Sequence, residues 1–143
     1  MTEYRNGPHT VYDIQYHLVW VTKYRYQILV GEVGVRVRDL LRQICMTNDI
    51  TINKGHVGSD HVHLLVSSPP QISVSKLLQS LKGKSSRMLQ QEYPTLRKRY
   101  WGRHLWARGY FCATVGAVTD KMVKAYIEQQ EAPPTDTFSV EGG

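Results

Sequence analysis

Two histidines, His61 and His63, are separated by one valine in the run Asp60-His61-Val62-His63-Leu64-Leu65-Val66. Alternate side chains of a β-strand point to the same face, so we expect both imidazoles on one side of a sheet and Val62 on the other. Two imidazoles about 7 Å apart at Cα can share a divalent cation, whereas the plainer interpretation is a hydrogen-bonded pair on a sheet surface. Because neither cysteine is expected nearby, the spacing indicates an open catalytic site rather than a closed zinc site.

Three other histidines, and Asp60 beside the pair, have ordinary structural interpretations. We expect His17, His56 and His104 to be structural or surface residues. Asp60 suits a turn, and that role suffices for it, although a carboxylate next to a histidine could also orient the ring.

Tyr126 and Gln130 are four residues apart in the last predicted helix and therefore share one of its faces. Met122, Val123 and Ile127 give that helix an apolar stripe by which it would dock. A tyrosine in such a stripe is usually a core residue, and the chain has nine tyrosines. A catalytic role for Tyr126 is favoured by the combination of a phenol and a carboxamide on one helix with a histidine pair and a basic surface.

Basic residues are concentrated in one stretch of the chain. The net charge is +6, yet nine of the eighteen Lys and Arg residues lie between Lys76 and Arg108, where the single acidic residue is Glu92. This asymmetry predicts a polyanionic partner that approaches from one side, most commonly nucleic acid. The alternative is that these charges only solvate a helix and a loop.

Within this stretch, basic side chains alternate with aromatic ones. Lys and Arg bind phosphates and flat rings stack on unpaired bases, so we expect contact with single-stranded nucleic acid. Tyr100, Trp101 and Trp106 are the candidate stacking residues, and a core or interface role is as plausible for the two tryptophans. The candidate DNA-binding residues are Lys82, Lys84 and Arg87 on a predicted helix, Arg97, Lys98, Arg99, Arg103 and Arg108 in the connector after it, and Lys23 and Arg25 after the first strand, where an ordinary surface role is as plausible.

The elements that would position these residues follow from periodicity. Alternation over 11–22 predicts a strand, and helical spacing from Val33 predicts a helix that ends at Asn48-Asp49. The β-rich runs 50–57 and 61–67 are separated by turn formers and predict a hairpin.

The second half of the chain adds a helix, a strand and a last helix. A helix follows the N-cap candidate Ser73 and ends before Tyr93-Pro94, and a connector then leads to a strand over 110–115 and a helix over about 119–130. The order predicts an α+β fold with a ferredoxin-like β-α-β-β-α-β antiparallel sheet and an added C-terminal helix that carries the tyrosine. This fold hosts many unrelated activities.

Length and composition bound the class of protein. A chain of 143 residues has room for one domain, which excludes a multidomain enzyme. We expect a flexible N-terminus over 1–10, a single domain over 11–132 and a mobile tail over 133–143. No apolar run is long enough to span a membrane and no secretory signal is present, so we expect a cytoplasmic protein. Cys45 and Cys112 are expected to be buried free thiols.

Six motifs follow one another along the chain. They are Gly55-His56-Val57, the run from Asp60 to Val66, Ser73-Val74-Ser75-Lys76, Leu81-Lys82-Gly83-Lys84-Ser85, Trp106-Ala107-Arg108-Gly109-Tyr110 and Tyr126-Ile127-Glu128-Gln129-Gln130. Each is weak alone, but their order and spacing resemble those of the small single-tyrosine HUH transposases of the IS200/IS605 insertion-sequence family. The similarity extends from about Tyr12 to Gln130.

This resemblance implies a metal-dependent DNA transposase. His61 and His63 would be ligands of Mg²⁺ or Mn²⁺, Gln130 the third protein ligand, and Tyr126 the nucleophile. The substrate would be single-stranded DNA with hairpins, cleaved and rejoined through a 5′-phosphotyrosine. The resemblance also implies a homodimer in which the tyrosine helix of one protomer can complete the active site of the other, and Gly116 before that helix is a candidate hinge.

Three other functions are open at this point. A domesticated relative could process chromosomal repeats with the same chemistry, and a ferredoxin-like module could bind nucleic acid without catalysis. A small zinc hydrolase would leave the basic stretch unexplained. A covalent protein–DNA adduct that Tyr126→Phe abolishes would distinguish the enzyme from the binding module.

Overall fold

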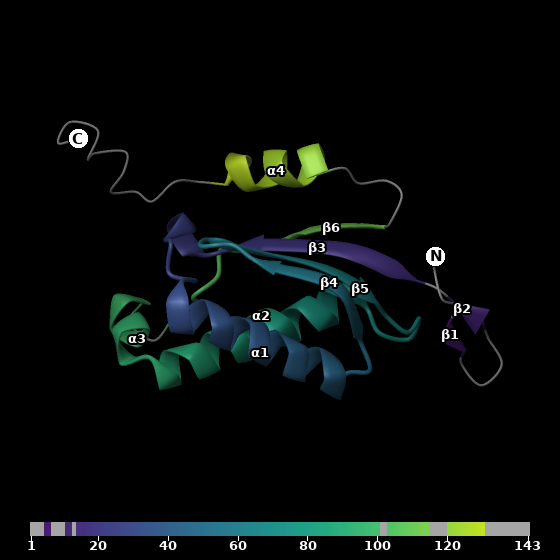
Figure 1. Ribbon diagram of the computed structural model, residues 1–143, viewed down its shortest axis with the longest axis horizontal. Coiled ribbons are helices and arrows are strands. Elements are labelled where there is room, and N and C mark those ends of the chain that lie inside the picture. Colours follow the sequence, from purple (N-terminus) through teal and green to yellow (C-terminus); the bar gives the residue numbers. More distant parts are fainter. Residues whose placement is uncertain (1–4, 7–10, 13, 101–102, 115–119, 131–143) are drawn as a thin grey trace.

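The computed structural model describes residues 5–6, 11–12, 14–100, 103–114 and 120–130 (Figure 1). Four strands form an antiparallel sheet in the order β4-β5-β3-β6. Their bounds are Gln15–Val21 for β3, Thr51–Val57 for β4, His61–Ser67 for β5 and Phe111–Thr114 for β6. Trp101, the hinge candidate Gly116 and the tail 133–143 lie outside the described residues.

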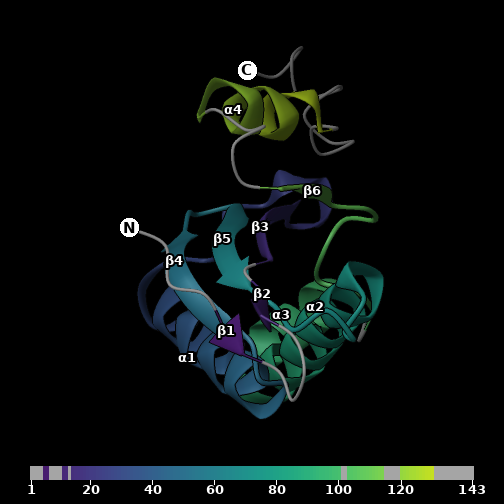
Figure 2. The same ribbon diagram turned by 90° about the vertical axis from the view of Figure 1, so that its right-hand side faces the viewer.

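Helices lie on both sides of this sheet. Helix α1, Gly31–Thr47, and helix α2, Val74–Glu92, cover one face, with α3, Pro94–Tyr100, following α2. Helix α4, Asp120–Gln129, lies across the opposite face, as the side view in Figure 2 shows. The order of strands and helices is that of a ferredoxin-like fold with an added C-terminal helix, and the predicted fold class is confirmed. None of the helices in the described ranges is long and apolar enough to cross a membrane.

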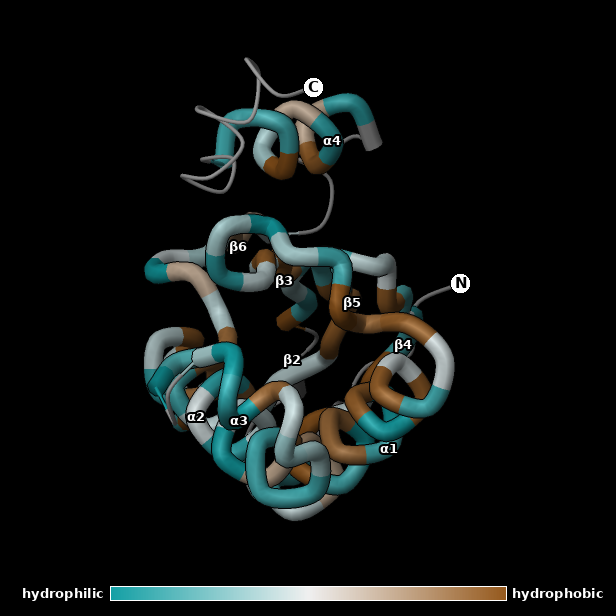
Figure 3. The backbone as a smooth tube through the Cα atoms, turned by 90° about the vertical axis from the view of Figure 1, so that its left-hand side faces the viewer, coloured by the Kyte–Doolittle hydropathy of each residue, from teal (hydrophilic) through white to brown (hydrophobic). Residues whose placement is uncertain are grey.

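Strand alternation separates a core face from a polar face. In the register of β3 with β5, Leu18 pairs with Leu64 and Trp20 with Val62, and all four side chains are buried beneath α1 and α2. The residues between them, such as His63 opposite Val19, point to the side of α4. Figure 3 shows hydrophobic segments of α4 on its side toward the sheet, as expected for an amphipathic helix docked there.

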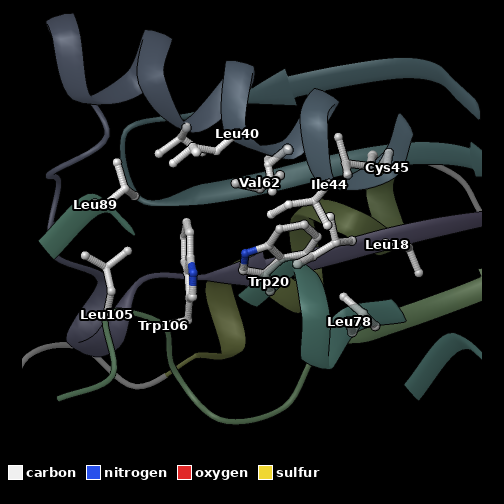
Figure 4. Packing of buried hydrophobic residues seen from close by; sticks show 14 of the residues in the cluster. Leu18, Trp20, Leu40, Ile44, Cys45, Val62, Leu78, Leu89, Leu105 and Trp106 are labelled. Atoms are coloured by element: carbon white, nitrogen blue, oxygen red, sulfur yellow. The ribbon is translucent and has the colours of Figure 1, made fainter. Parts of the chain in front are cut away.

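The core lies between the sheet and the helices α1 and α2, and two tryptophans form its centre (Figure 4). The rings of Trp20 and Trp106 pack edge to face with centroids 5.9 Å apart. Nε1 of Trp106 donates to Oγ of Ser85 at 2.9 Å, which satisfies the buried indole. Trp106 is 4% exposed and Tyr100 is 5% exposed, so the stacking role considered for both is wrong: they are core residues.

Helix α3 was not predicted, because Tyr93-Pro94 was interpreted only as the end of α2. Proline is also favoured at the first position of a helix, where its missing N–H costs nothing. Leu96 and Tyr100, one turn apart on α3, are both buried. The predicted connector therefore begins with a helix that packs on the core.

Several local predictions are confirmed. Oγ of Ser73 accepts from the backbone N–H of Lys76 at 3.1 Å, so it is the N-cap of α2. Cys45 and Cys112 are both free thiols as predicted, but only Cys45 is buried, and the expected burial of Cys112 is wrong because it is half-buried on β6.

The amino-terminal part of the chain differs in detail from the prediction. The strand expected over 11–22 is divided into β2, Val11–Tyr12, and β3. Arg5–Asn6, within the segment expected to be flexible, forms β1 and pairs antiparallel with β2.

Candidate active site

The histidine pair lies on the face of β5 that is opposite to α1 and α2. Val62 between the two histidines is fully buried, while His61 and His63 are half-buried, as strand alternation predicts. Nδ1 of His61 lies 2.9 Å from Oδ1 of Asp60, whose other oxygen, Oδ2, lies 3.3 Å from Nε of Arg25. His61 is therefore held by a carboxylate that is itself paired.

Two further histidines adjoin the pair. Nδ1 of His17 on β3 lies 3.0 Å from Nε2 of His63, within hydrogen-bond distance, and the ring centroids are 5.3 Å apart. His56 on β4 is paired in register with His63, and its ring lies 5.7 Å from that of His61. Three of these histidines, His17, His56 and His63, line a cavity of about 290 Å³ together with Lys54.

Sequence reasoning left His17 and His56 as structural residues, and the structure shows them beside the pair. The signal that could have found His56 is the short turn between β4 and β5, because a hairpin fixes which residues are opposite each other. His17 could not be found in this way, since β3 and β5 are distant in sequence.

Tyr126 is placed over the same face by α4. Its ring packs on that of Phe111 with centroids 5.5 Å apart. Phe111 on β6 is opposite Val19 on β3, and Val19 is opposite His63 on β5, so these three residues form a row across the sheet. The phenol is half-buried, and burial raises its pKa above the ordinary value of 10.0.

Gln130 follows directly after α4. Its Nε2 donates to the carbonyl oxygen of Tyr126 at 3.1 Å, so its amide is folded back onto its own helix. Within the described residues, no three His, Cys, Asp or Glu side chains are grouped closely enough to hold a metal ion. An ion on His61 and His63 would therefore need further ligands such as an amide, water or substrate oxygens.

The basic candidates fall into two groups. Lys84, Arg87, Arg97, Lys98, Arg99, Arg103 and Arg108 are exposed. Arg87, Arg97 and Arg103 line an open hollow of about 620 Å³ beside α2 and α3, on the helical side of the sheet. The guanidinium of Arg99 lies 3.8 Å from the centroid of the Tyr26 ring, a cation–π contact.

The remaining candidates have partners within the fold. Nζ of Lys82 donates to the carbonyl oxygens of Ala107 at 2.9 Å and Gly109 at 2.7 Å, and burial lowers its pKa. Nζ of Lys23 lies 5.4 Å from the centroid of the Tyr24 ring, and Arg25 is paired with Asp60. The structure thus gives Lys82 and Arg25 roles in the fold that the sequence did not suggest.

Comparison with known proteins yields close relatives. Residues 10–130 match the family model described as "Transposase IS200 like". The ISDra2 transposase TnpA of Deinococcus radiodurans is 41% identical over 128 residues, which cover 90% of this chain and 91% of that protein. The transposase for insertion sequence element IS200 of Salmonella typhimurium is 38% identical over 130 residues, or 91% of this chain and 85% of the relative.

Solved structures give the same picture of the fold. The crystal structure of a Deinococcus radiodurans protein assigned as a transposase has a TM-score of 0.83 and 38% identity, and the alignment covers 90% of this chain and 98% of that chain. A REP-associated tyrosine transposase bound to a REP hairpin has a TM-score of 0.54, with coverage of 90% and 69%. At 13% identity, this second likeness concerns the fold alone.

Proposed function

The chain belongs to the IS200-like transposase family and is thus a DNA-processing enzyme, and on that premise we propose that it cleaves and rejoins single-stranded DNA through Tyr126. The observation that carries this proposal is the row of Phe111, Val19 and His63 across the sheet, with the Tyr126 ring on one end and the histidine pair at the other. The site lies on the face of the sheet opposite to α1 and α2, where His61, His63 and Tyr126 are half-buried.

The proposed metal ligands are His61, His63 and Gln130, and the ion is Mg²⁺ or Mn²⁺. Two imidazoles on one strand face and a carboxamide near the tyrosine are a donor set that fits an open site, since water and phosphate oxygens can complete it. When bound, the ion supplies charge that polarises the scissile phosphodiester. Gln130 must leave the carbonyl of Tyr126 to take part in this site.

Tyr126 supplies the nucleophile. Its phenolate oxygen bonds to phosphorus while the bond from phosphorus to the 3′ oxygen breaks, and that oxygen takes up a proton and leaves as a DNA 3′-hydroxyl. The 5′ end then remains on the tyrosine as a phosphodiester. A second 3′-hydroxyl can bond to the phosphorus and release the tyrosine, so rejoining needs no ATP because one ester replaces another.

The proposed substrate is a single strand that carries hairpins, as in the REP hairpin bound by the structural neighbour. The exposed arginines beside α2 and α3 would contact its phosphates. The proposed assembly is a homodimer, since one tyrosine per chain holds one 5′ end at a time. Mixed dimers of Tyr126→Phe with His61→Ala chains would recover one active site if the tyrosine acts in the partner subunit, and none if it acts in its own.

A denaturing gel tests the proposal directly. The protein is incubated with Mn²⁺ and a hairpin-bearing oligonucleotide labelled at its 3′ end, so that the label stays with the fragment attached to the tyrosine. We expect a covalent adduct from the wild type and none from Tyr126→Phe. Tyr110→Phe is the matched control, since Tyr110 is an exposed phenol just before β6, and it should retain the adduct.

Two outcomes would contradict the proposal. A wild-type protein that only shifts the oligonucleotide on a native gel, with no adduct, is a binding module. An adduct that survives Tyr126→Phe assigns the nucleophile to another residue.

A further inference from the structure

Asp60 is a buried carboxylate at the turn between β4 and β5, with 8% of its surface exposed. Burying a carboxylate is costly unless it is paired and hydrogen-bonded. Both of its oxygens face side chains: Oδ1 lies 2.9 Å from Nδ1 of His61, and Oδ2 lies 3.3 Å from Nε of Arg25. A turn residue need only contact its own backbone, so a turn role does not account for this arrangement.

The backbone of Asp60 is fixed as firmly as its carboxylate. Its carbonyl oxygen accepts from the backbone N–H of Thr22 at 2.9 Å, and Oγ of Thr22 lies 3.3 Å from the same oxygen. Thr22 is fully buried and directly follows β3. Asp60 is therefore anchored through its backbone to the residue that follows β3, as well as to its own turn.

Arg25 reaches Asp60 from an unusual backbone conformation. Tyr24 and Arg25 have φ angles of 60° and 55°, in the left-handed region that non-glycine residues rarely adopt. Such residues persist only where their surroundings hold them. Here the N–H of Lys23 donates to Leu105 at 2.8 Å and the N–H of Arg25 donates to Thr22 at 2.9 Å.

Gly58 leaves room for the His61 ring. A Cβ atom at position 58 would lie 2.3 Å from Cε1 of His61 and 2.7 Å from Nδ1, closer than any real contact. The backbone N–H of Gly58 also donates to the carbonyl oxygen of His61 at 2.9 Å. The ring thus adjoins both a glycine and a paired carboxylate.

This geometry directs Nδ1 of His61 at Asp60, so Nε2 is the ring nitrogen left for a metal ion. With Nδ1 directed at Asp60, the hydrogen of the neutral ring belongs on Nδ1, and the lone pair belongs on Nε2. We propose that Asp60, held by Arg25, is a positioning residue that fixes the tautomer and orientation of His61, so that Nε2 is presented to a divalent cation. This inference rests on the proposed metal-dependent function and assigns Arg25 to the site's support rather than to DNA contact.

The first test reads the tautomer in the metal-free, full-length protein. Long-range ¹H–¹⁵N NMR at about pH 8, where imidazoles are neutral, reports which nitrogen of His61 carries the hydrogen. We expect Nδ1–H in the wild type and in Asp60→Asn, whose amide oxygen can still accept, and a mixture in Asp60→Ala. An Nε2–H ring in the wild type, or the same tautomer in Asp60→Ala, overturns the inference.

The second test measures Mn²⁺ affinity by electron paramagnetic resonance. Loss of an outer partner of a metal-binding histidine lowers affinity by about 10- to 100-fold, which we expect for Asp60→Ala. Asp39→Ala, which removes a surface ion pair with Arg38 and Arg42, is the matched control and should bind as the wild type does. Equal affinity in Asp60→Ala and the wild type contradicts the proposed role.

A second variant and a parallel assay of the DNA adduct complete these tests. If Asp60→Ala does not fold, Gly58→Ala displaces the ring while leaving Asp60 and Arg25 in place, and unchanged Mn²⁺ affinity in that variant overturns the inference. The DNA adduct is assayed in parallel. An Nδ1–H ring in a protein that forms no adduct contradicts the proposed function alone, whereas an adduct formed by a protein with an Nε2–H ring contradicts the positioning role alone.

Discussion

Tyr126 rests as a neutral phenol on the ring of Phe111, in an environment that opposes ionisation. Forming a phenolate at pH 7 costs about 4 kcal/mol for an ordinary tyrosine. Burial raises the pKa of Tyr126 above 10.0, so the cost is larger in this position. In the proposed reaction, attack on DNA would therefore require a positive charge that stabilises the phenolate, such as that of the bound ion, and the resting phenol is unreactive without it.

The raised pKa of Tyr126 is measurable in the absence of DNA. Alkaline titration at 295 nm, compared between the wild type and Tyr126→Phe, isolates this phenol, and we expect its step above pH 10.0. Because the folded-state pKa is above the unfolded one, this phenol stabilises the fold below pH 10 and loses that contribution as the pH rises through its folded value. A difference step at or below pH 10 would show that the phenol is well solvated.

At the scale of elements, Lys82 on α2 holds residues 107–109, which lead into β6, by hydrogen bonds. Its ammonium donates to the carbonyl oxygens of Ala107 and Gly109, and hydrogen bonds to a charged group contribute about 1.5–3 kcal/mol each. Partial solvent exposure reduces that figure. The sequence suggested DNA contact for this lysine, and the contacts indicate that it also supports the fold.

We expect Lys82→Ala to lower the free energy of unfolding by about 1–3 kcal/mol, as measured by urea denaturation. Lys84→Ala, at an exposed position of the same helix, should stay within about 0.5 kcal/mol of the wild type. An unchanged stability together with weaker DNA binding in Lys82→Ala would instead favour the DNA-contact role.

Elements with strong local signals could be predicted from the sequence. The N-cap at Ser73, the alternation of β5 and the amphipathic α1 depend on neighbours a few residues away, and each was found. Helix α3 was missed because Pro94 is both a stop and a start signal, and only burial of Leu96 and Tyr100 distinguishes them.

Contacts across strands could not be predicted in the same way. The pairing of Arg25 with Asp60 and that of His17 with His63 join residues 35 and 46 positions apart. They depend on a backbone turn in the left-handed region and on strand register, which local patterns do not contain. The histidine pair itself was found because a single strand holds both residues.

At the scale of the whole molecule, the sheet separates two surfaces. Helix α4, which carries Tyr126, lies on one side of the sheet, and α1, α2 and α3 lie on the other (Figures 1 and 2). The histidines face the side of α4, whereas the arginine-lined hollow lies beside α2 and α3. Each phosphate contact made by a basic residue releases counterions from the DNA. The slope of log K against log salt is therefore proportional to the number of such contacts.

We expect Arg97→Ala to weaken binding of a hairpin-bearing strand and to reduce the slope of log K against log salt by about 1. Arg38→Ala, an exposed arginine on α1, is the matched control and should leave the slope unchanged. Fluorescence anisotropy at several salt concentrations measures both. Equal slopes for the wild type and Arg97→Ala would remove this hollow from the DNA-binding surface.

The separation of the histidine face from the core also determines what a mutation at the histidines does to the protein. Such a mutation would remove the histidines without changing the core. The imidazoles of His61 and His63 lie outside the packed interior, so their loss would spare Trp20, Trp106 and the leucines around them. A copy inactivated there would still fold and could still occupy its binding sites. Broken copies of the element would then act as competitors of intact ones instead of disappearing as aggregates.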